Sequence, residues 1–176
     1  QMISNVELSP ELFASRDEVE NFLNHIRQMP THWTPFGHTS ITLHIKAPIF
    51  VARQLGKHQV GMVWNEVSRR YVTDKPEFFE GENWRKAADN VKQGSGAEFS
   101  ADENLTYIIQ DEYEDFIEEA QFVYETMLRR GVCPEQARMV LPQALFTEWY
   151  WTGNLYSFAN VFIQRSDSHA QKEVQQ

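Results

Sequence analysis

Pro48 constrains the local fold more than any other residue, because it stands where two hydrophobic patterns meet. Before it, the segment Ile41–Lys46 alternates apolar and polar residues, which predicts a half-buried strand. After it, Phe50–Leu55 continues as a predicted helix, and proline is favoured in the first turn of a helix. A strand that leads directly into a helix with charged side chains is a common arrangement for a phosphate site.

The remaining segments predict mainly helices. Ser15 and Glu18 form a capping-box pattern, and Pro30 ends the helix that follows them. No long linker divides the chain, so we expect one domain over residues 1–176. We expect a short helix from Trp84 to Asp89 and a long helix that ends at Gly131. The long helix should carry on one face Ile109, Phe116, Ala120, Val123 and Met127. A short helix is expected between Pro134 and Pro142, another helix from near Asn154 to Arg165, and a fraying tail beyond Gln171.

The charge and the single cysteine exclude several classes of protein. A net charge of -9 argues against a general nucleic-acid binder, which needs a basic surface. No apolar run approaches the roughly 20 residues of a membrane span, so we expect no membrane partner. Cys133 has no partner for a disulfide within the chain, which fits a reducing cytoplasm. A mononucleotide site remains compatible with this charge, because it needs only a few local cations.

The segment Asn65–Tyr71 is the first candidate binding site. If it is extended, Glu66, Ser68 and Arg70 project to one side and form a polar strip with a guanidinium fork suited to phosphate. Arg53, Lys57, Arg69 and Arg70 add a local positive cluster. The alternative interpretation, a polar surface strand with incidental salt pairs, is favoured by the pattern alone.

A second candidate site lies nearer the C-terminus. Arg138 stands among apolar residues and therefore needs an anion or a carboxylate, for which Glu135 or Glu148 are structural candidates. Asn154 and Arg165 are about three helical turns apart and share a face, whereas Asn160 lies off that face.

The chain lacks the patterns of several well-known active sites. Its 6 histidines show no zinc-binding spacing, so we expect no metal. It has no glycine-rich dinucleotide fingerprint and no P-loop. Ser68 has no base placed for it by the sequence, which favours a hydrogen-bonding role over a nucleophilic one.

Blocks along residues 30 to 172 resemble the flavin-dependent thymidylate synthases in the same order. Such an ordered series is far more specific than a single motif. The blocks are His32–His38 (HWTPFGH), Lys46–Gln54 (KAPIFVARQ), Asn65–Tyr71 (NEVSRRY), Lys92–Ser95 (KQGS), Glu135–Pro142 (EQARMVLP), Thr147–Asn154 (TEWYWTGN) and Asp167–Gln171 (DSHAQ).

The resemblance implies an α+β fold with a central, mostly antiparallel sheet flanked by helices, and a homotetramer whose active sites form between subunits. It also implies conversion of dUMP to dTMP, with FAD as cofactor and methylenetetrahydrofolate and NADPH as co-substrates. No enzyme nucleophile takes part in this chemistry, so Cys133 is interpreted as structural.

The family's functional residues match positions of this chain. Arg165 matches the arginine that polarises the uracil and is the expected catalytic residue. The expected dUMP ligands are Gln54, Lys57, Glu66, Ser68, Arg69, Arg70, Arg138 and Arg165. The expected FAD ligands are His32, Thr34, Lys57, His58, Gln59, Glu66, Asn154 and Asn160.

This chain departs from the family pattern in places. Lys57-His58-Gln59 stands where the family has Arg-His-Arg, the spacer before Asn65 is longer by one residue, and Gly37 stands where an acid is common. These departures leave three alternatives: a divergent synthase of cellular or viral origin, a flavin- and folate-dependent hydroxymethylase acting on dUMP or dCMP, or a nucleotide-binding protein that has lost turnover.

Overall fold

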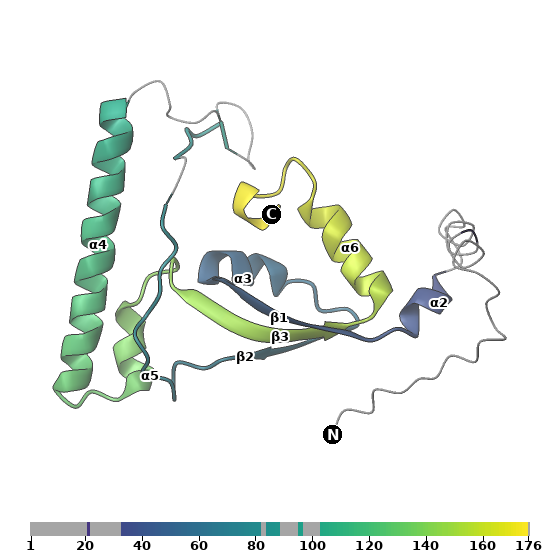
Figure 1. Ribbon diagram of the computed structural model, residues 1–176, viewed down its shortest axis with the longest axis horizontal. Coiled ribbons are helices and arrows are strands. Elements are labelled where there is room, and N and C mark those ends of the chain that lie inside the picture. The colour runs from purple at the N-terminus through teal and green to yellow at the C-terminus, as the bar shows by residue number, and fades with distance from the viewer. Residues whose placement is uncertain (1–20, 22–32, 82–83, 89–94, 97–102, 176) are drawn as a thin grey trace.

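The computed structural model describes residues 21, 33–81, 84–88, 95–96 and 103–175. In this part of the chain, strands β1 (Ile41–Pro48), β2 (Met62–Glu66) and β3 (Phe146–Gly153) form a sheet of order β1-β3-β2. Both strand pairs are antiparallel, so the strand that comes last in the sequence lies in the centre (Figure 1). The expected combination of helices with an antiparallel sheet is therefore confirmed.

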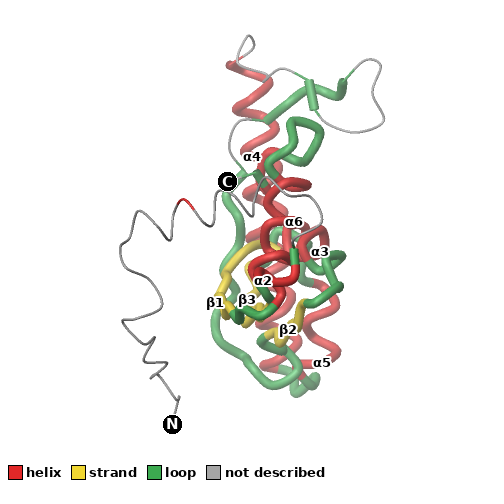
Figure 2. The backbone as a smooth tube through the Cα atoms, turned by 90° about the vertical axis from the view of Figure 1, so that its right-hand side faces the viewer, coloured by secondary structure: helices red, strands yellow, loops and turns green. Residues whose placement is uncertain are grey.

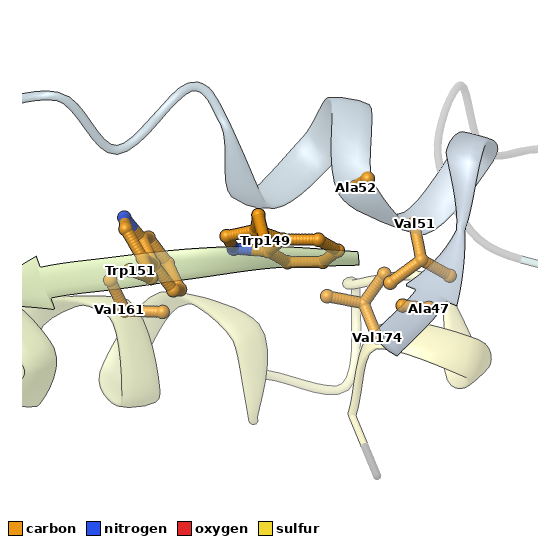
Figure 3. Packing of buried hydrophobic residues seen from close by; sticks show 7 residues of the cluster. All are labelled: Ala47, Val51, Ala52, Trp149, Trp151, Val161 and Val174. Carbon is orange, nitrogen blue, oxygen red and sulfur yellow. The ribbon is translucent and has the colours of Figure 1, made fainter. Parts of the chain in front are cut away.

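One face of the sheet carries the core. In the register of β1 and β3, Trp149 lies opposite Ile45 and Trp151 opposite Leu43. Trp149 is fully buried, and its ring stacks on that of Trp64 with centroids 4.2 Å apart. Figure 3 shows the buried cluster around Trp149 and Trp151, and its members are Ala47, Val51, Ala52, Trp149, Trp151, Val161 and Val174.

Helices α3 (Ile49–Leu55) and α6 (Leu155–Arg165) supply the residues that cover this face (Figure 1). As predicted, α3 starts directly after Pro48, whose extended backbone turns the chain from strand into helix. At the start of α6, the Asn154 carboxamide oxygen accepts a hydrogen bond of 2.8 Å from the Ser157 amide. Such a cap satisfies one of the free amides in the first helical turn. The predicted helices at both positions are confirmed.

The long helix α4 (Glu103–Arg129) stands at one end of the sheet, followed by α5 (Pro134–Ala137) and the 3-10 turn η1 (Arg138–Val140) (Figures 1 and 2). Gly131 follows α4 with a φ of 86°, a left-handed conformation that glycine adopts without strain. The predicted apolar face is partly wrong, because the Phe116 side chain is 56% exposed whereas Ala120 and Tyr124 are buried. The buried face is therefore rotated away from Phe116.

Two other predictions are wrong, and one lies almost wholly outside the described residues. Residues 84–88 are not helical, because the Trp84 ring packs against Tyr113 and its indole nitrogen donates to Gln110. The tail beyond Gln171 does not fray: it forms the turn η2 (Lys172–Val174), and Val174 is buried in the core. The helix expected over 15–30 lies outside the described residues apart from position 21, which is helical.

The short helix α2 (Thr34–Gly37) lies beside the start of α6, where the Trp33 and Tyr156 rings are 5.3 Å apart. None of the helices in the described ranges has the length and apolar character to cross a membrane. Among the same residues, no group of histidine, cysteine and acidic side chains is arranged to hold a metal ion.

Candidate functional site

Arg165 sits in the last turn of α6 and is held at two points. Its Nε donates to His58 Nε2 at 2.8 Å, and its Nη2 donates to the Gln54 carbonyl oxygen at 3.0 Å. Gln54 belongs to the last turn of α3, whose carbonyl groups lack partners within the helix. The guanidinium therefore joins the C-terminal ends of two helices, and tertiary packing fixes its orientation.

His58 must be neutral to accept this hydrogen bond. A neutral imidazole that accepts at Nε2 carries its proton on Nδ1, and a protonated imidazole has no acceptor left. Burial, and secondly the positive charge of Arg165, lower the pKa of His58 below its usual 6.5. The structure therefore couples the charge of His58 to the position of Arg165.

This coupling predicts a pH dependence of stability. Between the lowered folded-state pKa of His58 and the ordinary value of 6.5, the unfolded chain binds the proton and the folded chain does not. The contribution of neutral His58 to the free energy of unfolding is therefore fully present above this pH window, and it is lost as the pH drops through the window. We expect His58→Gln, which does not titrate, to remove this component of the pH dependence. Urea unfolding midpoints between about pH 5.5 and 7.5 measure it, and equal pH slopes for both proteins in this window contradict the prediction.

The chain turns at Gly61, between His58 and β2. This glycine has a φ of 71°, and a Cβ atom there would lie 2.5 Å from the Ser157 Oγ. The same hydroxyl donates to the Val60 carbonyl at 3.0 Å. A glycine is therefore required here, both for its backbone conformation and for the close approach of α6. The segment between His58 and β2 therefore packs closely against the start of α6.

A hollow of about 370 Å³ is lined by four of the eight expected dUMP ligands and is called the Arg138 hollow. Its polar lining residues are Glu66, Ser68, Arg69, Arg138 and Thr147. The Arg138 Nε donates to the Glu135 backbone carbonyl at 3.3 Å, and the side chain is exposed rather than buried among apolar residues as expected.

Neither proposed carboxylate partner of Arg138 pairs with it. The carboxylate of Glu135 pairs with Arg70 at 3.3 Å, and that of Glu148 lies 3.0 Å from His44. Within the described residues, the positive charge of Arg138 is therefore not matched by a carboxylate. This arrangement suits the binding of an anion from solution.

Two further hollows adjoin the end of α3. The first, of about 640 Å³, is called the Trp64 hollow, and its lining includes Arg53, Lys57, His58, Gln59, Trp64 and Glu66. The second, of about 510 Å³, is called the Arg165 hollow, and its lining is Gln54, Lys57, Arg85, Ser95, Arg165, His169, Ala170 and Gln171. Lys57 borders both of them, while Glu66 borders the Trp64 and Arg138 hollows. The expected ligands that border these three hollows therefore follow one another from the end of α3 to the end of β2.

The structure does not bring all expected ligands together. The prediction that Glu66, Ser68 and Arg70 project from one extended segment is wrong, because β2 ends at Glu66 and the chain turns. In this turn the Tyr71 amide donates to the Ser68 carbonyl at 3.1 Å, and Arg70 is directed to Glu135. Arg70 therefore lies outside the three hollows.

The expected FAD ligands are the most dispersed. Thr34 is exposed on α2, Asn154 is used as a helix cap, and Asn160 is half-buried on α6. None of these three borders the hollows described above. His32 and most of the block Lys92–Ser95 lie outside the described residues, but Ser95 borders the Arg165 hollow.

Several lining residues were not predicted. Trp64 precedes Glu66 by two positions on the same strand, so the alternation of strand side chains places both on one face. That signal was available in the sequence. Arg85 and Gln171 were missed because their roles depend on contacts between segments far apart in the chain, which no local pattern reports.

The chain is similar to known proteins over most of its length. Residues 3–176 match the family model described as Thymidylate synthase complementing protein. The flavin-dependent thymidylate synthase of Thermosipho africanus is 45% identical over 145 residues, which cover 82% of this chain and 62% of that protein. The flavin-dependent thymidylate synthase of Thermotoga neapolitana is 36% identical over 172 residues, which cover 98% and 70%. The chain thus spans about three fifths of the first relative's length.

A solved structure is similar as well. The UMP/dUMP methylase PolB from Streptomyces cacaoi, bound with 5-Br dUMP, superposes with a TM-score of 0.74 at 25% identity, over 92% of this chain and 72% of that one. The chain therefore belongs to the thymidylate synthase complementing protein family, the family of the flavin-dependent thymidylate synthases.

Proposed function

We propose that this chain is a flavin-dependent thymidylate synthase, which converts dUMP to dTMP with methylenetetrahydrofolate as one-carbon donor and FAD and NADPH as the reducing system. The observation that carries the proposal is Arg165, whose guanidinium is oriented by His58 and the Gln54 carbonyl and borders a hollow with Lys57. Family membership and the relatives named above support it.

Arg165 is suited to activate the uracil ring. Methylation at C5 requires negative charge to build up on the pyrimidine, and a guanidinium near that charge stabilises the transition state more than the ground state. Its two hydrogen bonds hold it in place before the substrate binds, so little reorganisation is needed. Cys133 lies at the start of α5 and borders none of the three hollows, which supports a reaction without a cysteine nucleophile.

The donor set fits a flavin nucleotide. Arg53, Lys57 and Gln59 offer cationic and amide donors for phosphate, and the Trp64 ring borders the same hollow as an aromatic surface for a planar ring. When bound, FAD supplies the hydride and takes part in the one-carbon transfer. Lys57 replaces a family arginine as a point charge without a bidentate fork, so phosphate is held by charge rather than by a paired geometry.

The substrate phosphate is assigned to the Arg138 hollow, where Ser68, Arg69 and Arg138 provide a hydroxyl and two guanidinium groups. Arg165 borders a different hollow of the same chain. We therefore propose that each active site combines hollows of different subunits in a homotetramer. The apolar stripe on the outer side of α6, where Phe162 is 71% and Ile163 66% exposed, supports an assembly that covers it.

Shared sites make a specific prediction. Arg138→Ala and Arg165→Ala are each expected to be inactive as homotetramers. After the two variants are mixed, dissociated and reassembled, sites that take Arg138 from one subunit and Arg165 from another regain both residues. We expect turnover to return to about a quarter of the wild-type level on statistical grounds. Mixtures that stay inactive although mixed tetramers are detected by mass spectrometry contradict shared sites.

The reaction itself is tested directly. The proposal predicts a yellow protein with flavin absorbance, and tritium release from 5-tritiated dUMP that depends on methylenetetrahydrofolate and NADPH. The mass of the product distinguishes a methyl from a hydroxymethyl group, and a parallel assay with dCMP tests the base. A protein that neither takes up flavin nor releases tritium is not this enzyme.

A further inference from the structure

The C-terminal turn η2 is attached to the rest of the molecule by a partly buried ion pair. Glu173 Oε1 lies 2.5 Å from Arg85 Nη2, and the two side chains are only 16% and 15% exposed. The next residue, Val174, is buried in the core with Val51 and Ala52 of α3. Charged pairs at this depth lose much of their hydration, so each charge depends on its partner, and removal of one leaves the other uncompensated.

Arg85 is itself fixed from the other side. Its Nε donates to the Ser95 hydroxyl at 2.7 Å. Its neighbour Trp84 packs its ring against Tyr113 of α4, with centroids 5.3 Å apart, and donates from its indole nitrogen to Gln110 at 2.8 Å. Arg85 thus connects the side of the molecule formed by α4 with η2, and it does so across the rim of the Arg165 hollow.

A chain of hydrogen bonds leads from η2 to Arg165. Gln171, directly before η2, accepts a hydrogen bond from the Gln54 side chain. The backbone carbonyl of the same Gln54 accepts from Arg165 Nη2 at 3.0 Å. The position of the C-terminal turn is therefore transmitted through Gln54 to the guanidinium, and Gln171 also forms part of the hollow's wall.

We propose that the Arg85–Glu173 ion pair positions Arg165, by holding the C-terminal turn against α3 so that Gln171 and Gln54 form a fixed wall of the Arg165 hollow. This inference rests on the proposed function for its catalytic consequence, but the positioning itself is testable without turnover. Glu173 does not border the hollow, so its effect is exerted through other residues.

Glu173→Gln tests the pair with little change in shape. The amide keeps the volume of the side chain but removes the negative charge, which leaves Arg85 without its partner. We expect kcat to fall about tenfold to a hundredfold, because small misplacements of a catalytic group have effects of this order. KM for dUMP should change less than about threefold, since the phosphate ligands lie in the Arg138 hollow. Glu112→Gln, an exposed acid on α4, is the matched control and should behave as wild type.

His58 provides a readout that a general loss of stability would not move. The charged groups that border its hollow are Arg53, Lys57 and Glu66, and Arg165 contacts it directly. If Arg165 moves away in Glu173→Gln, the lowering of the His58 pKa by that charge is lost. Carbon-13 NMR titration of labelled histidine, assigned with His58→Gln, should show the His58 pKa moving toward its usual 6.5 in the folded variant.

Glu173→Asp is the second variant, for the case that Glu173→Gln does not fold. It keeps the charge on a shorter side chain, so kcat and the His58 pKa should lie between those of wild type and those of Glu173→Gln. If Glu173→Gln does not fold, Glu173→Asp should still show a lower kcat than wild type and a His58 pKa closer to the usual value. An unchanged His58 pKa and an unchanged kcat in a folded variant overturn the positioning role. A shifted His58 pKa in a protein without turnover supports the positioning role while removing the proposed reaction.

Discussion

Arg165→Ala is expected to lower turnover of dUMP by about 100- to 1,000-fold, the range found when one preorganised donor to a developing negative charge is removed. The variant loses the charge beside the pyrimidine and the hydrogen bonds to His58 and Gln54. The fold should be retained, because the side chain is half-buried at the end of a helix and contributes no apolar packing to the core. The His58 pKa should rise, since one of the causes that lower it is removed.

The measurement is tritium release under saturating dUMP, with circular dichroism and the flavin content recorded for the same preparations. Arg130→Ala is the matched control, because Arg130 is an exposed arginine just after α4 and borders none of the three hollows. If Arg165→Ala retains wild-type kcat with an intact fold, the catalytic role proposed for Arg165 is wrong.

Trp149→Ala should have the largest effect on stability, lowering the free energy of unfolding by about 3–5 kcal/mol. Trp149 lies in the central strand and is fully buried, with one ring face against Trp64. Its removal leaves a cavity between the sheet and the helices that cover it, and the rigid strand pairs on both sides cannot close it. Because domains of this kind are stable by roughly 5–15 kcal/mol, this loss is a large fraction of the total.

Tyr150→Ala is the comparison variant, because Tyr150 is next in the same strand and points to the opposite face. Its side chain is 55% exposed and stacks on His44 at 4.9 Å. We expect a loss of less than about 1 kcal/mol for this exposed ring pair. Urea unfolding followed by tryptophan fluorescence measures both variants. Similar losses for the two substitutions would contradict the assignment of the core to one face of the sheet.

Local patterns predicted the elements that depend on neighbouring residues. The strand at Ile41 and the helix after Pro48 follow from alternation and from the fixed backbone of proline, and both are present. Gly131 ends the long helix as predicted, because glycine adopts the left-handed conformation without strain. The central strand β3 was not predicted as a strand, although its aromatic and β-branched residues favour one.

The ligand residues were chosen from the resemblance to the family, and the structure arranges only some of them together. Glu66, Ser68, Arg69 and Arg138 border one hollow, and Gln54, Lys57 and Arg165 border another. The expected strip through Arg70 failed because a turn at Ser68 takes that side chain to Glu135. Alternation predicts which way a side chain points only as long as the strand continues.

By itself, the sequence determined the family and the main helices, since both depend on residue identities and spacings along the chain. Only the tertiary structure decided which groups meet: Arg165 with His58 and Gln54, Glu173 with Arg85, and Val174 with α3. These partners are joined by packing and hydrogen bonds between segments far apart in the chain. Propensity and periodicity describe only neighbouring residues, so they contain no information about such contacts.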